Sequence, residues 1–310
     1  MSATLELRAG DARVALVPAT GGAIAEFTLD GRDAMRSMPA SAIAAGDVRQ
    51  AAAYPLVPYS NRIRDARLAF AGRTYALARN FGDHPHAIHG VGWQRAWQVI
   101  RRDPHAAALT LRHDAEGDAA RAWPWRFSAT QCFGLVARDG GATLAVTMTI
   151  RNDDDAPFPF GIGWHPYFPR EGATTLAFAA DGVWRNDATQ LPLERVAVPR
   201  EWDFSAAKPV GDVPLDNVFT GWQGEANLAL PQRGLAIRLT ADSACRYVVV
   251  YAPAGRDFVA VEPVTHETDA FNRAAAGATG TGMRVLPPGA AFSCTMRISV
   301  RATRAARALA

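Results

Sequence analysis

The stretch Ala142–Arg151, ATLAVTMTIR, alternates large apolar side chains with small or polar ones. One face of this segment carries Leu144, Val146, Met148 and Ile150. Alanine and threonine occupy the positions between them. Successive side chains of a β-strand point to opposite faces, so this period of two predicts a strand with one buried and one solvated face.

The same pattern recurs along the chain. Segments rich in valine, threonine, phenylalanine and tyrosine predict further strands at Phe127–Val136, Leu235–Thr240, Tyr247–Tyr251, Phe258–Glu262 and Phe292–Val300. The 26 glycines and 20 prolines leave little room for long helices, so we expect only short ones, at Ala40–Ala53 and Arg301–Ala310. There is no internal repeat and no linker, and the chemically distinctive segments are spread along the chain. We therefore expect one all-β domain, residues 1–310, built as a large antiparallel β-sandwich.

Composition excludes several classes of protein. The chain has 310 residues, 49% of them hydrophobic, which is ample for a core. The net charge of +3 arises from scattered arginines without a dense basic stripe, so we expect no nucleic-acid partner. No signal-peptide pattern opens the chain and no apolar run approaches a membrane span, which predicts a cytoplasmic protein with no membrane partner. The three cysteines, Cys132, Cys245 and Cys294, are expected to be buried free thiols.

Two segments in the first third of the chain carry candidate ligand-binding residues. In Tyr54–Arg64, YPLVPYSNRIR, Arg62 follows Asn61 and offers a fork of donors for hydroxyl groups; alternatively, it is a solvated surface arginine. In Phe81–Trp93, FGDHPHAIHGVGW, three histidines stand close together. A metal site is not expected, because no matching ligands occur elsewhere and a proline interrupts the cluster. Gly90 and Gly92 would let the backbone approach a ligand, and Trp93 would offer a stacking face.

A single histidine marks the segment Phe160–Arg170, FGIGWHPYFPR. His165 lies between aromatic residues and follows a Gly-x-Gly. A histidine in apolar company is often a structural core residue. It is also the side chain that most often acts as a general acid or base, and aromatic rings are the surfaces on which sugar rings stack.

Two carboxylates complete the candidate set. Asp216, in PLDNVFTGW, is expected to lie beside Phe219 and Trp222, an arrangement common for holding sugar hydroxyls because a carboxylate accepts from two at once; alternatively, the Asp-Asn pair forms a turn. Glu262 ends the predicted strand within Asp257–Arg273, DFVAVEPVTHETDAFNR. Burial there would raise its pKa and suit it to proton transfer; alternatively, it pairs with an arginine.

Taken in order, the segments NRI, HxxHG, HPYF, DNVF and VEP…DAFN resemble those of the aldose 1-epimerase (galactose mutarotase) family, over about Tyr54 to Pro288. The resemblance implies the galactose mutarotase-like supersandwich with an open sugar-binding cleft. It implies that Glu262 is the general base and His165 the general acid. It implies that Asn61, Arg62, His89 and Asp216 bind the sugar. Glutamines that well-known members carry near the base are absent from YVVVYAP and EPVTH, so strict galactose specificity is not implied.

The predicted activity is interconversion of the α and β anomers of a free aldose, with no cofactor and no metal. The partner would be a monosaccharide, and the protein a monomer or homodimer. Three alternatives remain open from the sequence. One is a hexose-phosphate mutarotase that uses Arg64, Arg67 and Arg95. The others are a non-catalytic carbohydrate-binding protein and a glycoside hydrolase that pairs Asp216 with Glu262.

Overall fold

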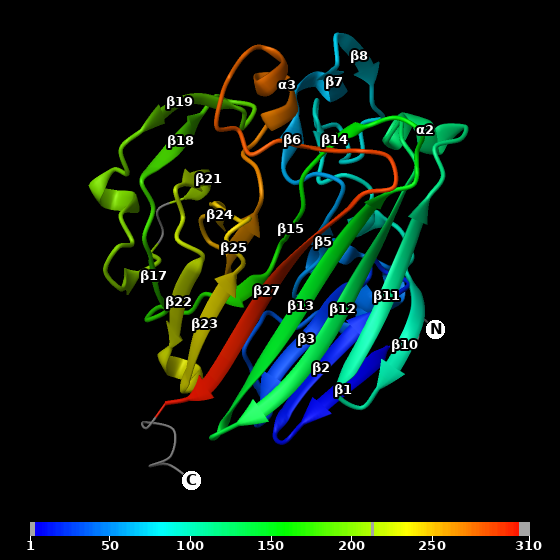
Figure 1. Ribbon diagram of the computed structural model, residues 1–310. Helices are drawn as coiled ribbons and strands as arrows, with labels where there is room; N and C mark the ends of the chain where they lie inside the picture. Colours follow the sequence, from blue (N-terminus) through cyan, green and yellow to red (C-terminus); the bar gives the residue numbers. More distant parts are fainter. Residues whose placement is uncertain (1–3, 212–213, 304–310) are drawn as a thin grey trace.

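The computed structural model describes residues 4–211 and 214–303, and antiparallel sheets dominate it (Figure 1). The largest sheet has nine strands. In spatial order they are β10 (Gln98–Asp103), β11 (Ala106–His113), β12 (Phe127–Arg138), β13 (Gly141–Asn152), β27 (Ala291–Ala302), β23 (Leu235–Ala241), β22 (Glu225–Leu230), β17 (Thr175–Phe178) and β20 (Lys208–Pro209).

A second sheet has eight strands and carries much of the candidate site. Its order is β19 (Pro192–Val196), β18 (Gly182–Asn186), β21 (Leu215–Thr220), β24 (Tyr247–Ala252), β25 (Phe258–Val264), β15 (Gly163–Trp164) and β5 (Pro55–Leu56), with β16 (Tyr167–Pro169) also paired to β25. A four-stranded sheet comprises β1 (Leu5–Ala9), β2 (Ala12–Val17), β3 (Ala23–Leu29) and β4 (Arg32–Asp33). Three small ribbons pair β14 (Phe158–Phe160) with β26 (Arg284–Leu286), β6 (Arg62–Ile63) with β9 (Ala87–Ile88), and β7 (Arg67–Phe70) with β8 (Arg73–Ala76).

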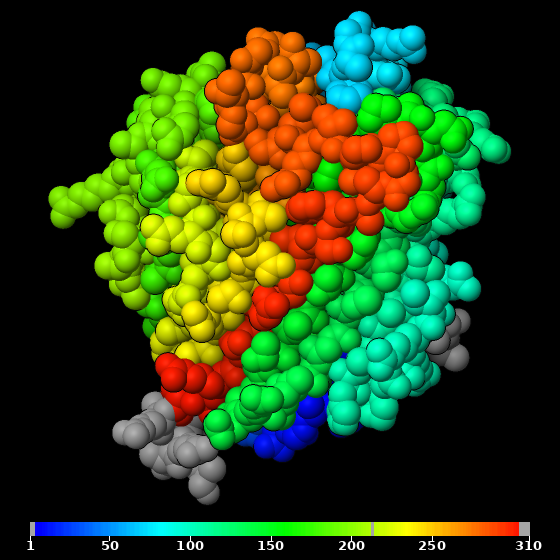
Figure 2. Space-filling view, viewed as in Figure 1, coloured from blue at the N-terminus to red at the C-terminus, as the bar shows by residue number. Residues whose placement is uncertain are grey.

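The centre of the nine-stranded sheet shows why the alternating segment is a strand. Along β13, the large apolar side chains are buried and the residues between them are partly exposed. On the more exposed face, Thr147 bonds Thr295 of β27 at 2.9 Å, and Thr149 bonds Ser293 at 2.8 Å. Cross-strand pairs of this kind fix the register between neighbouring strands. Figure 2 shows the consequence for the chain: the C-terminal β27, in red, runs between segments from the middle of the sequence.

The core consists of two clusters of buried apolar side chains. The larger cluster includes residues of the nine-stranded and four-stranded sheets, such as Val146, Ile298 and Phe27. The smaller cluster includes Tyr54, Tyr167 and Val249. Full burial of one aliphatic side chain contributes about 1.5–3 kcal/mol, so both clusters stabilise the fold.

Helices are short, as the sequence predicts. They are α1 (Ala40–Ala45), α2 (Asp118–Ala122) and α3 (Ala270–Ala275), with 3-10 turns at η1 (Val48–Gln50), η2 (Arg64–Ala66), η3 (Gly92–Gln94), η4 (Arg200–Trp202) and η5 (Pro231–Arg233). Thus Ala40–Ala53 does contain helical turns. In the tail, Arg301 and Ala302 extend β27 instead of starting a helix, and residues 304–310 lie outside the described part of the chain. No helix among the described residues is long and apolar enough to cross a membrane.

The prediction of three buried thiols is wrong for one cysteine. Cys132 is exposed, because it occupies an outward position of β12 while its neighbours Gln131 and Phe133 point inward. Cys245 and Cys294 are buried and free, and their sulfur atoms lie 3.1 Å apart.

Candidate active site

Strand pairing brings His165 and Glu262 together. Glu262 belongs to β25, and the short strands β15 and β16 on either side of His165 both pair with β25. Their registers, Gly163 with Val264 and Tyr167 with Ala260, place His165 opposite the glutamate. The His165 Nε2 and Glu262 Oε1 atoms are 3.1 Å apart, and both side chains are almost fully buried.

Burial shifts the pKa values of this pair in opposite directions. Desolvation raises the pKa of Glu262 well above its ordinary value, with a further contribution from Asp216. Desolvation lowers the pKa of His165 well below its ordinary value, assisted by His89 and Arg36. Between the lowered pKa of His165 and the raised pKa of Glu262, the pair holds one transferable proton. This proton can lie on Glu262, as a carboxylic acid beside neutral His165, or on His165, as an imidazolium beside the carboxylate. The two forms carry the same number of protons and interconvert by proton transfer between Nε2 and Oε1.

Two tyrosines hold the His165 ring in place. The ring stacks on Tyr167, with centroids 4.5 Å apart, and lies 4.7 Å from the ring of Tyr54. The two hydroxyl groups are 3.2 Å apart, and the Tyr167 hydroxyl is 3.4 Å from His165 Nε2. Burial raises the pKa of both tyrosines, so they stay protonated near neutrality. The Arg36 guanidinium lies 3.7 Å from the Tyr167 ring centroid.

The remaining predicted residues form a connected polar group. Arg62 donates through Nη1 to Asn61 Oδ1 and through Nη2 to Asp216 Oδ2, each at 3.0 Å. His89 Nδ1 accepts the backbone N–H of Asn61 at 3.0 Å, which leaves Nε2 to carry the proton of the neutral ring. Burial, followed by the charge of Arg62, lowers the pKa of His89 to about 3. His89 is therefore a neutral donor near pH 7.

The backbone at Asn61 and His89 is left-handed. Their φ angles are 56° and 61°, a region that non-glycine residues seldom adopt. The two residues flank the paired strands β6 and β9, where Arg62 faces Ile88, and they also exchange a bond from His89 N to Asn61 O. Such strained conformations persist where the surrounding structure holds them, and they are frequent at functional sites.

All six residues predicted from the sequence line one cleft of about 790 Å³. They are Asn61, Arg62, His89, His165, Asp216 and Glu262. The cleft is also lined by Tyr54, Tyr167, Tyr251 and Arg36, for which the sequence predicts no role. Tyr167 stands two residues after His165 in HPYF, so its proximity to the histidine was a usable signal. Tyr54 lies far from His165 in the sequence and gave no such signal. Arg36 lies in a segment without any motif and gave no such signal.

Some expectations about neighbouring residues were wrong. Phe219 and Trp222 are core residues, because Phe219 points to the face of β21 opposite Asp216; the ring across from Asp216 is Tyr251 of β24. Trp93 is also nearly fully buried, so its ring offers little stacking surface. Gly90 is not among the cleft-lining residues, and a side chain there would lie 2.4 Å from the carbonyl oxygen of Val57.

The Gly-x-Gly before His165 likewise serves packing. A Cβ atom at Gly161 would lie 1.8 Å from the ring of His266, so no larger residue fits between these segments. The three arginines proposed for a phosphate, Arg64, Arg67 and Arg95, are not among the cleft-lining residues. Arg64 instead pairs with Asp269, with its Nε 3.6 Å from Oδ2.

The clustered histidines do different things. His84 Nδ1 accepts from the backbone N–H of His86 at 3.3 Å, and His86 Nδ1 accepts from that of Asp65 at 3.0 Å. The His89 ring contacts His165 instead, with centroids 5.5 Å apart. Within residues 4–211 and 214–303, no group of three or more histidine, cysteine or acidic side chains is arranged to hold a metal ion.

Solved structures with the same architecture are known. A protein from Escherichia coli K12, provisionally named an aldose 1-epimerase, superposes with a TM-score of 0.86 at 28% identity, over 97% of this chain and 99% of that one. A galactose mutarotase-like protein from Clostridium acetobutylicum gives a TM-score of 0.83 at 18% identity, over 96% of this chain and 95% of that one. The fold is thus that of the galactose mutarotase-like proteins, which confirms the predicted all-β class.

Sequence comparison gives the family. The uncharacterized protein YphB of Escherichia coli K12 is 31% identical over 288 residues, which cover 90% of this chain and 93% of YphB. The family model of aldose 1-epimerase matches residues 3–299. The chain belongs to the aldose 1-epimerase family, as its ordered motifs predicted.

Proposed function

We propose that this protein is a mutarotase that interconverts the α and β anomers of a free aldose. The observation that carries the proposal is the contact of 3.1 Å between Glu262 Oε1 and His165 Nε2 in a cleft lined with hydroxyl-binding groups. A base and an acid that share one proton supply the two proton transfers that opening a cyclic hemiacetal requires.

The reaction balances with these two side chains alone. The Glu262 carboxylate takes the proton of the C1 hydroxyl while protonated His165 donates to the ring oxygen, and the bond from C1 to the ring oxygen breaks. Rotation about the C1–C2 bond presents the other face of the aldehyde. On closure, His165 takes back its proton and Glu262 returns one to the new hydroxyl. Each positioned transfer accelerates such a step by about 10²–10⁴-fold.

The other polar groups are assigned to sugar binding. Arg62 is fixed by two side chains and His89 by a backbone amide, so their donors are oriented before the ligand arrives. Preorganised groups lower the entropic cost of binding. Asp216 contacts Arg62, and Glu262 contacts His165, so the two carboxylates do not pair with each other. This arrangement favours proton exchange between an acid and a base over glycoside hydrolysis, which uses two facing carboxyl groups.

Polarimetry tests the proposal. Freshly dissolved α-galactose, α-glucose, arabinose and xylose are followed to equilibrium with and without the enzyme. We expect a faster approach to the same final rotation for at least one sugar. Rates equal to the buffer rate for every sugar, together with tight sugar binding, would support a non-catalytic carbohydrate-binding protein instead.

The pH dependence should show a broad bell. Low pH adds a second proton to the pair and removes the base; high pH removes the last proton and leaves no acid. Because the pKa of His165 is lowered and that of Glu262 is raised, the lowered pKa sets the acid limb and the raised pKa sets the alkaline limb. We expect a plateau of kcat/KM between these two limbs after subtraction of the buffer rate. A narrow optimum between the ordinary values of 4.5 and 6.5 would show two independent groups and contradict the shared proton.

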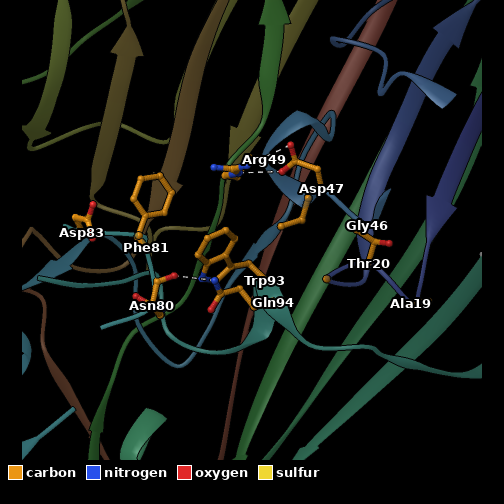
Figure 3. A pocket seen from close by; sticks show the side chains of 13 residues that line it. Ala19, Thr20, Gly46, Asp47, Arg49, Asn80, Phe81, Asp83, Trp93 and Gln94 are labelled. Atoms are coloured by element: carbon orange, nitrogen blue, oxygen red, sulfur yellow. Dashed lines mark hydrogen bonds and ion pairs between the residues drawn. The ribbon is translucent and has the colours of Figure 1, made fainter. Parts of the chain in front are cut away.

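Free aldoses should be better substrates than their terminal phosphates. A phosphate dianion is usually met by several unpaired cations or by a backbone nest. Four arginines line this cleft. Arg62 is paired with Asp216 and Arg49 with Asp47 (Figure 3), and Arg36 donates to the carbonyl oxygens of Arg49 and Ala51. Among these four, only the Arg256 side chain is not engaged in this way, and one cation falls short of the several that a phosphate needs. We expect kcat/KM for glucose and galactose to exceed that for the 6-phosphates by at least about tenfold, or about 1.4 kcal/mol. A preference for either phosphate would make the enzyme a hexose-phosphate mutarotase.

A further inference from the structure

The motif DAFN, residues 269–272, has no part in the proposed reaction, although it follows the strand that carries the general base. Asp269 is the residue before α3 and is only 4% exposed. Burying a carboxylate costs free energy unless hydrogen bonds replace the lost water. The hydrogen-bond partners of Asp269 therefore indicate why a carboxylate stands at this position.

Asp269 bonds the backbone on both sides of Arg62. Its own backbone N–H donates to the carbonyl oxygen of Arg62 at 2.9 Å. Its Oδ1 atom accepts the backbone N–H of Arg64, also at 2.9 Å. These two bonds fix the short stretch of chain from which the Arg62 side chain extends toward Asn61 and Asp216.

Asn272 extends this clamp and orients the carboxylate. Its Oδ1 accepts the backbone N–H of Ala69 at 2.7 Å, and its Nδ2 donates to the carbonyl oxygen of Arg67 at 2.9 Å. The same Nδ2 donates to Asp269 Oδ1 at 2.7 Å. The two polar residues of the motif thus hold the backbone along much of the segment 62–69.

The clamped segment has an unusual backbone. Asn61, Asp65 and Ala66 have φ angles of 56°, 52° and 53°. Asp269 itself has φ of 56°. Residues other than glycine seldom adopt this left-handed region, and such conformations persist where the surrounding structure holds them. The bonds from Asp269 are part of that support, and Arg62 lies within the segment that they hold.

We propose that Asp269 is a positioning residue for sugar binding: it fixes the backbone at Arg62 so that the guanidinium meets the hydroxyl groups of the sugar. The inference rests on the proposed function, in which Arg62 binds the sugar. Asp269 is not among the cleft-lining residues, so it acts through Arg62 and touches no substrate. Because its segment continues from β25, the clamp also ties the sugar-binding segment to the strand of Glu262.

A double-mutant cycle with Arg62 tests the proposal. Asp269→Gly removes the carboxylate and keeps the left-handed backbone, which glycine adopts freely. We expect it to raise KM and the sugar Kd about tenfold, with kcat within a few-fold of the parent value. In the Arg62→Ala background, the same substitution should change KM by less than about twofold, because its effect passes through that arginine. No rise in the parent background, or an equal rise in both, would overturn the proposal.

A conservative variant and a matched control separate positioning from folding. Asp269→Asn keeps an acceptor oxygen and tolerates the left-handed φ, so its KM should stay within about twofold of the parent value. The control is Asp30→Gly, at an exposed aspartate outside the cleft that also has a left-handed φ, of 53°, and pairs with Arg32. It should change neither KM nor kcat. A KM raised as far by Asp269→Asn as by Asp269→Gly would contradict the assigned role.

Two further outcomes are covered by the same design. If Asp269→Gly does not fold, Asn272→Ala takes its place: it keeps the carboxylate, removes the amide that orients it, and should raise KM about threefold in the parent background only. No rise, or an equal rise in both backgrounds, would overturn the proposal. If the parent enzyme turns over no sugar, the mutarotase proposal fails separately, and the cycle is then measured on the sugar Kd by calorimetry.

Discussion

Glu262→Gln should lower kcat by about 10²–10⁴-fold and leave KM within a few-fold of the parent value. The amide keeps the size of the side chain and can still accept a hydrogen bond from His165 Nε2, which lies 3.1 Å from the carboxylate oxygen. It cannot take a proton from the C1 hydroxyl. Polarimetry with saturating sugar measures the loss, and calorimetry or NMR titration measures the retained binding.

Thermal stability shows whether Glu262→Gln has lost only the base or has also damaged the fold. The pKa of Glu262 is raised in the folded protein, so the unfolded chain loses the Glu262 proton at a lower pH than the folded chain. As pH rises from 4.5 toward the folded pKa, the ionisation of Glu262 therefore lowers the free energy of unfolding. Glu262→Gln removes that loss, and its Tm near neutrality should equal or exceed that of the parent. The control is Glu171→Gln, at a half-buried glutamate paired with Arg233 outside the cleft, which should keep full kcat. Turnover near the parent rate in Glu262→Gln would remove this residue from the mechanism.

The strands could be predicted because they depend on a local rule. In a sheet with one buried face, apolar and polar side chains alternate along each strand, and Ala142–Arg151 shows this alternation in its sequence. The same rule corrects two errors in the interpretation. Residues three apart in a strand face opposite sides, so Phe219 could not flank Asp216. Adjacent residues also face opposite sides, so Cys132 points outward because Gln131 points inward. The apolar character of a residue alone does not say which face it occupies.

The candidate site was predicted to a large extent by motifs, and its geometry was not. His165 and Glu262 are far apart in the sequence, and only the pairing of β15 and β16 with β25 brings them together. Arg36 could not be found in this way. Its position depends on the chain after β4 crossing to Tyr167, where the backbone N–H of Arg36 donates to the Tyr167 carbonyl at 2.9 Å. Such long-range packing leaves no local pattern.

His165→Asn is expected to cost about as much as the loss of the base, about 10²–10⁴-fold in kcat. Asparagine cannot protonate the ring oxygen, and the stacked arrangement with Tyr54 and Tyr167 is lost with the imidazole. Part of the effect will be structural, so the control is His113→Asn. That histidine is also buried, bonds the carbonyl oxygen of Trp123 at 2.8 Å, and lies outside the cleft. The His113→Asn variant should have a lower Tm, with kcat near the parent value.

The double variant Glu262→Gln/His165→Asn shows whether the two groups act on one proton. If they do, removing either partner already abolishes the paired transfer, and the double variant should be about as slow as the slower single variant. The pH dependence of all three variants should flatten to the buffer profile, because no variant retains a group that titrates with its partner. Losses that multiply in the double variant, or a surviving bell in either single variant, would show independent groups. In that case the contact of 3.1 Å would be structural, and another acid would have to be sought among Tyr54, Tyr167 and His89.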